Sequence, residues 1–159
     1  MDAEVATALR AMLAQTQTAA LATLHRGMPA VSMVPWVWSP ELEALLIHVS
    51  DLATHTQDMR EQARVGLMIC AEPSADVPAQ ALPRVSFQAE AQFLDRADAA
   101  QYQAQAQLYL ARFPDAEVTF ELADFSLVAL RPRSARLVAG FAQAHSLVGE
   151  SLLAWLRGS

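Results

Sequence analysis

The feature that most constrains the fold is a series of three short apolar segments in the first third of the chain, separated only by turns. Segments 19–25, 30–38 and 44–50 are typical of β-strands. The links between them, at 26–29 and 39–41, have hairpin length and contain glycine or proline. Parallel neighbours need a crossover of about a dozen residues or more, so links this short predict an antiparallel meander.

The rest of the chain adds further strands and four helices to this meander. The hydrophobic spacing predicts four helices, at 3–15, 96–112 and 145–157 and from a start within 50–56 to about Ala63. It predicts further strands at 64–71, 83–94, 119–131 and 133–140. The Arg131-Pro132 pair is expected to separate the last two strands. Short strands with flanking helices favour a mainly β, α+β fold with an antiparallel barrel over a doubly wound parallel sheet.

Length and composition predict a single domain, 1–159, that associates with a second copy of itself. Hydrophobic residues make up 53% of the chain and the mean hydropathy is +0.19, which indicates more apolar surface than one core buries, as in a homodimer. No apolar run approaches the ~18 residues of a membrane helix, and the acidic start is not typical of a secretory signal. We therefore expect a cytoplasmic protein with no membrane partner.

Charge and missing motifs exclude several classes of function. The net charge is −6 and the chain has no lysine, which argues against a nucleic-acid partner. Cys70 is the only cysteine, so an internal disulfide and a cysteine-based zinc site are excluded. There is no dinucleotide-binding fingerprint, P-loop or nucleophile elbow. The catalytic residues, if any, remain unknown.

The junction between a strand and a helix at 50–56 is a candidate anion site. A helix N-terminus presents unpaired backbone N–H groups and a partial positive charge. Here Ser50, Thr54, His55 and Thr56 can all hydrogen-bond a phosphate. The alternative is that Ser50 or Asp51 merely caps the helix, which is the commoner role of such residues.

Pro35 marks the second candidate, the strand segment 31–36. Proline cannot donate to a strand ladder, so backbone groups beside it are left unpaired and can serve a planar polar ligand such as a flavin ring. The alternative is a plain edge strand. Trp36 and Trp38 are predicted to share one face, as core, dimer contact or cofactor wall.

Three residues in the second half of the chain complete the candidates. Arg84 opens an apolar strand and either binds an anion or lies solvated at the strand end. Gly140 allows close approach of a cofactor or another chain. His145 precedes the predicted last helix and is either a haem or metal ligand or an ordinary surface residue.

The order and spacing of these motifs resemble the pyridoxamine-phosphate-oxidase-like FMN-binding split barrels, and among them the branch associated with haem utilisation. The resemblance covers about residues 5–148. The segments that carry it are Ala19–Leu24, Gly27–Pro29, Ser32–Pro35, His48–Ser50, Leu52–Thr56, Arg84–Ser86, Asp124-Phe125 with Leu127, and Arg136–Phe141.

The resemblance implies a split β-barrel homodimer that binds FMN at the subunit interface and acts as an oxidoreductase on a small-molecule substrate. It assigns Ser32, Met33, Val34 and Pro35 to the flavin ring, Ser50, Leu52, Ala53, His55 and Thr56 to the phosphate, Arg84 to the phosphate from the neighbouring strand, and Gly140 and Phe141 to an approach from the partner. The arginine-rich C-terminal strand of the true oxidase is not matched, so pyridoxamine phosphate is not the expected substrate.

Two alternatives stay open. His55 stands near a lysine position of the family and the chain has no lysine, so FMN is expected to be held weakly. The haem-utilisation branch implies a haem-binding or haem-degrading protein with His145 as axial ligand. Asp115 or another loop carboxylate is the candidate group to orient His145 across the dimer. The third hypothesis is a non-catalytic barrel that has lost its cofactor.

Overall fold

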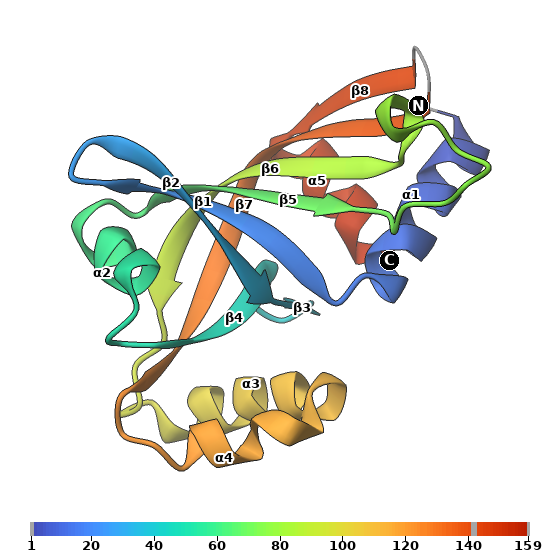
Figure 1. Ribbon diagram of the computed structural model, residues 1–159. Helices are drawn as coiled ribbons and strands as arrows, with labels where there is room; N and C mark the ends of the chain where they lie inside the picture. The colour runs from blue at the N-terminus through green and yellow to red at the C-terminus, as the bar shows by residue number, and fades with distance from the viewer. Residues whose placement is uncertain (1, 141–142, 159) are drawn as a thin grey trace.

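The fold is a strongly curved antiparallel sheet of eight strands with helices at its ends (Figure 1). The computed structural model describes residues 2–140 and 143–158. The strands are β1 (Thr18–His25), β2 (Met28–Pro35), β3 (Val37–Ser39), β4 (Ala44–Ser50), β5 (Arg64–Cys70), β6 (Arg84–Phe93), β7 (Phe125–Gly140) and β8 (Gln143–Val148). The helices are α1 (Ala3–Gln15), α2 (Thr54–Glu61), α3 (Ala99–Arg112), α4 (Glu117–Phe120) and α5 (Gly149–Arg157), with short 3₁₀ turns η1 (Ala79–Ala81) and η2 (Pro114–Ala116).

The strand order is β2-β1-β5-β6-β7-β4-β3, with β8 added to β7. Strand β7 pairs with β6 on one side, while its other side pairs first with β4 and then with β8. The sheet is not closed, although its end strands β2 and β3 are separated in sequence only by Trp36. The expected antiparallel α+β fold is confirmed, but the meander is not continuous, because β2 and β3 lie at opposite ends of the strand order.

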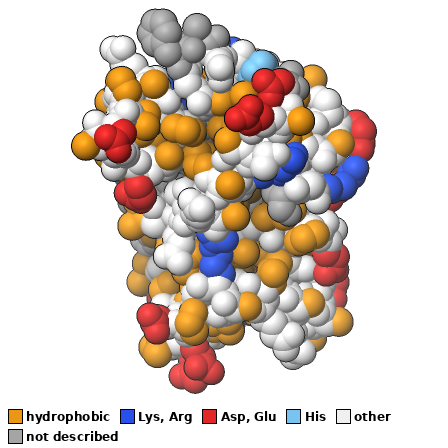
Figure 2. Space-filling model, turned by 90° about the vertical axis from the view of Figure 1, so that its right-hand side faces the viewer, with side chains coloured by type: hydrophobic (Ala, Val, Ile, Leu, Met, Phe, Trp, Pro, Cys, Tyr) orange, Lys and Arg blue, Asp and Glu red, His pale blue; other side chains and the backbone are white. Residues whose placement is uncertain are grey.

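The helices cover different parts of the sheet. Helix α2 packs against β1, α1 and α5 pack against β7, and α3 packs beside β3. Figure 2 looks onto the side of the molecule where α1, α5 and the end of α3 lie, and hydrophobic side chains are spread among charged ones there. No helix within residues 2–140 and 143–158 is both long and apolar enough to cross a bilayer.

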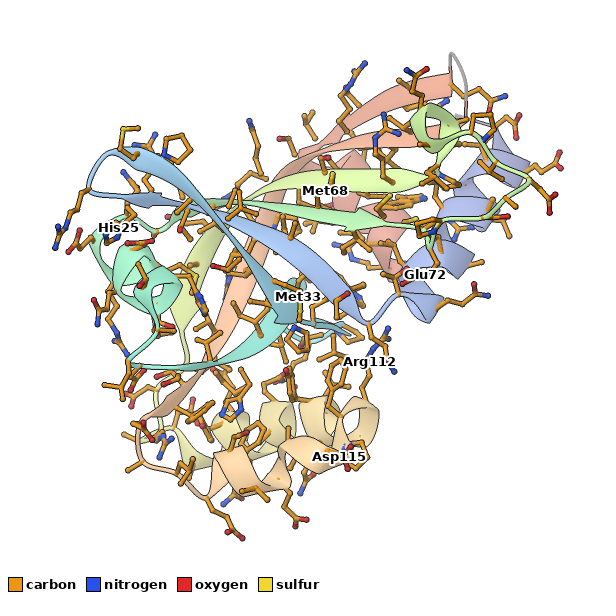
Figure 3. All side chains as sticks on the ribbon, in the orientation of Figure 1. His25, Met33, Met68, Glu72, Arg112 and Asp115 are labelled. Carbon is orange, nitrogen blue, oxygen red and sulfur yellow. The ribbon has the colours of Figure 1, made fainter. Side chains whose placement is uncertain are left out.

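The outward face of β2, β1 and β5 carries exposed apolar side chains. Val31 and Met33 on β2 are 72% and 67% exposed, and Met68 on β5 is 42% exposed. Their strand registers place them on one face, since Met33 lies opposite Ala20 and Ala20 lies opposite Met68. Figure 3 labels Met33 and Met68 on these strands. Exposed apolar surface of this kind is typical of a contact site for another molecule.

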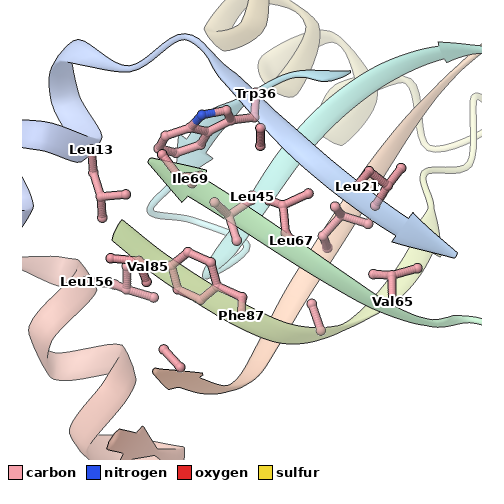
Figure 4. Packing of buried hydrophobic residues seen from close by; sticks show 14 of the residues in the cluster. Leu13, Leu21, Trp36, Leu45, Val65, Leu67, Ile69, Val85, Phe87 and Leu156 are labelled. Atoms are coloured by element: carbon pink, nitrogen blue, oxygen red, sulfur yellow. The ribbon is translucent and has the colours of Figure 1, made fainter. Parts of the chain in front are cut away.

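The core lies on the inner face of the sheet (Figure 4). It is built by alternate residues of the strands and closed by α1 and α5; its fully buried members include Leu9, Leu21, Leu45, Ile47, Leu67, Ile69, Val85, Leu130, Leu137 and Leu152. A second, smaller cluster on the other face of β4 and β7 is covered by α3. Strand β4 is therefore buried on both faces, which explains its unbroken apolar sequence.

The segment 119–131 differs from its predicted strand. Residues 117–120 form helix α4, and β7 begins at Phe125 and continues through the expected break at Pro132. The register on β6 shifts there, because Ala89 pairs with Pro132 while Gln88 pairs with Ser134. This bulge accommodates a proline that cannot donate a ladder hydrogen bond.

The last predicted helix starts later than expected. Residues 143–148 form strand β8, and α5 begins at Gly149, whose φ of 52° turns the chain from strand to helix. The Ser151 hydroxyl donates to the Val148 carbonyl oxygen and supports this start. His145 consequently lies within a strand, opposite Leu137, rather than ahead of a helix.

Candidate functional site

Apart from Ser32–Pro35 on β2, the structure places the predicted site residues in two groups at opposite ends of the long strands. Ser50, Leu52, Ala53, His55 and Thr56 lie where β4 leads into α2. Arg84, Gly140 and His145 lie at the start of β6, the end of β7 and on β8, and Phe141 lies outside the described residues.

The length of strand β6 gives the distance between the two groups of residues. Its last residue, Phe93, lies under the guanidinium of Arg60 in α2, 4.1 Å from the ring centroid. Arg84 is the first residue of the same strand, and at ~3.3 Å per residue it is roughly 30 Å from Phe93. Contrary to the expectation, Arg84 therefore does not reach the proposed phosphate-binding residues at 50–56 of the same protomer.

The α2 N-terminus has unpaired donors. Its N-cap residue, Ala53, provides no side-chain cap, so the capping role that competed with anion binding is filled by neither Ser50 nor Asp51. The Ser50 hydroxyl accepts from the Leu52 N–H at 3.2 Å, and the buried Thr56 hydroxyl donates to the Ser50 carbonyl oxygen at 2.7 Å. Within the described residues, the Thr54 and His55 backbone N–H groups have no acceptor.

The charges around this helix end are largely balanced. The Asp51 carboxylate accepts hydrogen bonds from Ser126 at 2.6 Å and Arg60 at 2.9 Å. These hydrogen bonds outweigh burial and hold its carboxyl pKa below the ordinary value. Burial lowers the pKa of His55, although the nearby Asp58 opposes this effect, so His55 is neutral at pH 7. The helix end thus offers hydrogen-bond donors, while the neighbouring Arg60 is already paired.

Strand β2 is an edge strand, as Pro35 suggested. It pairs only with β1 among the described residues, which leaves one edge of its backbone for another partner. Ser32 and Val34 face inward, whereas Met33 faces outward, so the side chains of Ser32–Pro35 cannot all line one flavin ring. Trp36 is 3% exposed and belongs to the core.

The other end of the sheet holds a histidine and two arginines. His145 is half-buried and its side chain forms no hydrogen bond within residues 2–140 and 143–158. Arg84 donates to the carbonyl oxygens of Gln80 and Leu82, and Arg136 contacts the Ser146 hydroxyl at 3.4 Å. Neither arginine pairs with a carboxylate in the described part of the chain.

Asp115 does not join this group within one protomer. It lies in η2, and Figure 3 shows it next to the C-terminal end of α3, away from β8. A contact with His145 therefore requires a second subunit. The residues that the structure describes contain no cluster of three His, Cys, Asp or Glu side chains suited to a metal ion.

His48 is a buried histidine whose environment the sequence did not reveal. Its ring stacks on Phe120 with a centroid distance of 3.7 Å, and its Nδ1 lies 3.3 Å from the Thr119 hydroxyl. Its Nε2 is buried without a hydrogen-bond partner in the described residues. Burial, aided by the positive charge of Arg96, lowers the pKa of His48 to about 4. The only available signal was its position in an apolar strand.

Replacing His48 is expected to change how stability depends on pH. Because the folded pKa is about 4 and the ordinary value is 6.5, the unfolded chain binds the additional proton, and wild-type stability falls as pH drops through this window. His48→Phe keeps a ring on Phe120 and should lose this component. One proton gives at most about 1.4 kcal/mol per pH unit, less where solvent screens it. Urea unfolding at pH 4 to 7 measures the effect, and equal pH slopes for both proteins contradict it.

Comparisons with known proteins agree with the fold. The sequence model of the pyridoxamine 5'-phosphate oxidase family matches residues 5–139. Haem oxygenase HutZ of Vibrio cholerae is 28% identical over 141 residues, 87% of this chain and 78% of that protein.

Two solved structures are also similar. A haem-binding protein from Mycobacterium smegmatis superposes with a TM-score of 0.81 at 28% identity, over 97% of this chain and 62% of that one, so this chain spans less than two thirds of that relative. The structure of HutZ, described as a haem storage protein of Vibrio cholerae, superposes with a TM-score of 0.70 at 24% identity, over 88% of this chain and 91% of that one.

Proposed function

The chain belongs to the pyridoxamine 5'-phosphate oxidase family, and we propose that it is a haem-binding protein that functions as a homodimer with His145 as an iron ligand. The observation that carries the proposal is the half-buried His145 imidazole, which has no hydrogen-bond partner among the described residues. A neutral imidazole nitrogen is a common axial ligand of haem iron. The similar proteins named as a haem-binding protein of Mycobacterium smegmatis and a haem oxygenase of Vibrio cholerae support haem as the ligand.

The residues around His145 fit an amphipathic, anionic ligand. Leu137 lies opposite His145, and Leu147 follows two residues later on the same face of β8, which gives the imidazole apolar neighbours. Arg84 and Arg136 lie at the same end of the sheet without carboxylate partners in the described residues, but on its other face, because Arg84 pairs with Val138 and Arg136 with Ser146 while His145 pairs with Leu137. These arginines can bind the two propionate groups of a haem held by His145 only where a second copy of the chain supplies them. Haem supplies iron redox chemistry when bound; the chain supplies the ligand, the apolar wall and the charge.

The two separated groups of site residues support a homodimer. One protomer places its α2 end and its Arg84 end roughly 30 Å apart, so a single pocket that uses both needs a second copy. The exposed apolar face around Val31, Met33 and Met68 is suited to that contact. Two symmetry-related sites at one interface are the expected arrangement.

Titration with haemin tests the proposal. The purified protein should bind about one haem per chain and develop a Soret band shifted from that of unbound haemin. Light scattering on the same sample should give twice the 17.3 kDa mass of the chain. A spectrum that stays that of unbound haemin at saturation overturns haem binding.

FMN is a second candidate ligand, favoured by the uncapped α2 N-terminus and the unpaired edge of β2. A phosphate can accept from the Thr54 and His55 N–H groups, and the β2 edge can hydrogen-bond the flavin ring. The chain would then act as an FMN-dependent oxidoreductase, with the flavin supplying the electron transfer. The absence of lysine from the chain and the pairing of Arg60 indicate weak phosphate affinity.

Thr54→Pro tests the FMN candidate without disturbing the helix. Thr54 is the first helical residue, where proline is favoured, and Ala53 has the extended backbone that precedes proline well. The substitution removes one phosphate donor and should weaken FMN binding about tenfold, the order expected for a hydrogen bond to a charged group. Thr54→Ala keeps the N–H and is the matched control. Equal FMN affinities in a fluorescence titration contradict this site, and a protein that binds neither FMN nor haemin is the barrel without cofactor.

A further inference from the structure

A separate pocket of about 190 Å³ lies between the C-terminal ends of α1 and α3, the segment Trp36–Trp38 and helix α5. Figure 3 shows Arg112 at the end of α3, facing α1 across this gap. Figure 2 looks onto this side, where hydrophobic groups surround a basic group near the middle of the face. None of the haem or FMN candidate residues lines this pocket.

The walls of the pocket are apolar. Leu13 of α1, Leu45 of β4 and Leu156 of α5 line it together with Val37. These side chains come from elements far apart in the sequence, and Leu13, Leu45 and Leu156 also belong to the core. Apolar walls of this kind favour a hydrocarbon body over a strongly hydrated one.

Two hydrogen-bond donors in the lining residues lack acceptors. The Arg112 guanidinium donates through Nη2 to the carbonyl oxygens of Ala14 and Thr16, at 3.2 and 2.8 Å, but its buried Nε has no partner in the described residues. The indole Nε1 of Trp36 is likewise buried and unpartnered there, in a residue only 3% exposed. Both groups can only donate, so the complementary ligand is an acceptor.

The charge of Arg112 narrows the chemical class of the ligand further. Within residues 2–140 and 143–158 no carboxylate pairs with Arg112. Its half-buried guanidinium has only neutral hydrogen-bond acceptors there, the Ala14 and Thr16 carbonyl oxygens, so an anion is the favourable ligand. One negative charge balances the guanidinium, whereas a dianion would leave an excess charge in an apolar pocket. The Arg112 Cζ lies 5.4 Å from the Trp36 ring centroid, a cation–π contact that keeps the two side chains side by side at the pocket.

We propose that this pocket binds a small aliphatic monocarboxylate, with its carboxylate on the Arg112 and Trp36 N–H groups and its chain against the apolar wall. The pocket of about 190 Å³ is roughly six times the ~30 Å³ share of a water molecule, which suits a chain of about six carbon atoms. The site is independent of the haem proposal, because it shares no residue with it.

Hexanoate is the test ligand, with hexanol and hexylamine as controls of equal chain length. Isothermal titration of the full-length protein should show hexanoate binding, with hexanol at least about tenfold weaker and hexylamine not bound. Trp36→Phe keeps an aromatic ring but removes the N–H, and should weaken hexanoate about tenfold while leaving hexanol unchanged. Arg112→Gln should abolish the preference for hexanoate over hexanol.

Trp155→Phe is the matched control, because Trp155 also has a buried, unpartnered indole N–H in the described residues but does not line the pocket. It should bind hexanoate as the wild type does. Equal affinity for hexanol and hexanoate, equal losses in Trp36→Phe and Trp155→Phe, or no hexanoate binding by folded wild-type protein overturns the proposal. If Arg112→Gln unfolds, Trp36→Phe still decides. His145→Ala should keep hexanoate binding, which separates this site from the haem site.

Discussion

The His145→Ala variant is expected to lose specific haem binding. His145 is the proposed iron ligand, and its imidazole makes no hydrogen bond within the described residues, so its removal should cost the site its iron contact and leave the surrounding fold intact. The affinity for haemin should fall by more than ~10–100-fold. That range is the typical effect of losing a residue that only supports a metal ligand through a hydrogen bond. The measurement is a haemin titration that follows the Soret band of wild type and variant at equal protein concentration.

His25→Asn is the control for this experiment. His25 lies at the far end of β1, where its Nδ1 is 2.8 Å from the Asp58 carboxylate, and asparagine can still donate to that carboxylate. This variant should keep the wild-type Soret band. If His145→Ala binds haemin as tightly as wild type, another residue ligates the iron and the assignment of His145 is wrong.

Val31→Glu is expected to convert the proposed homodimer into a monomer. Val31 is 72% exposed on β2, the end strand of the apolar face that we assign to the dimer contact. Burying a carboxylate without a partner in the dimer contact costs several kcal/mol. One exposed valine contributes far less to the stability of the fold, so the substitution should disrupt association and not folding. Light scattering should show the mass falling from twice the chain mass to 17.3 kDa. Haemin binding should weaken in parallel, because in our proposal a second subunit completes the site.

Val118→Glu provides the matched comparison. Val118 is 68% exposed on α4, away from the apolar face of β2 and β5, so the same substitution there should leave the dimer intact. A wild-type protein that is monomeric at micromolar concentration, or a Val31→Glu protein that remains dimeric, contradicts the interface. Thermal unfolding of each variant verifies that the fold is retained.

Local sequence patterns predicted the elements whose partners are close in sequence. The β1–β2 hairpin and helices α1 and α3 follow from alternation, helical spacing and turn residues. Strand β8 was missed because Leu147 and Val148 fit a helical pattern with the residues of α5, and only Gly149 marks the change. Pro132 was read as a break because a bulge on the paired strands is not visible in the sequence of one of them.

The candidate site was predicted by motif but not by arrangement. The sequence indicated the helix N-terminus at 50–56 and the edge strand at Pro35, and both are present. The position of Arg84 at the opposite end of the sheet depends on strand order, which local patterns do not determine. The pocket at Arg112 was missed for the same reason, since Arg112 and Trp36 are brought together only by the tertiary fold.

The pairing of β4 with β7 has a consequence for how the chain folds during synthesis. Strand β4 is buried on both faces, yet its neighbour β7 pairs Leu45 with Leu130, 85 residues further along the chain. At ~5–20 residues per second, a ribosome needs on the order of 4–17 s to produce that partner. Until then a strand that is buried almost throughout in the folded protein is available to wrong partners. We therefore expect newly made chains to depend on chaperones at high expression and to fold slowly in isolation, as proteins with non-local strand pairing generally do.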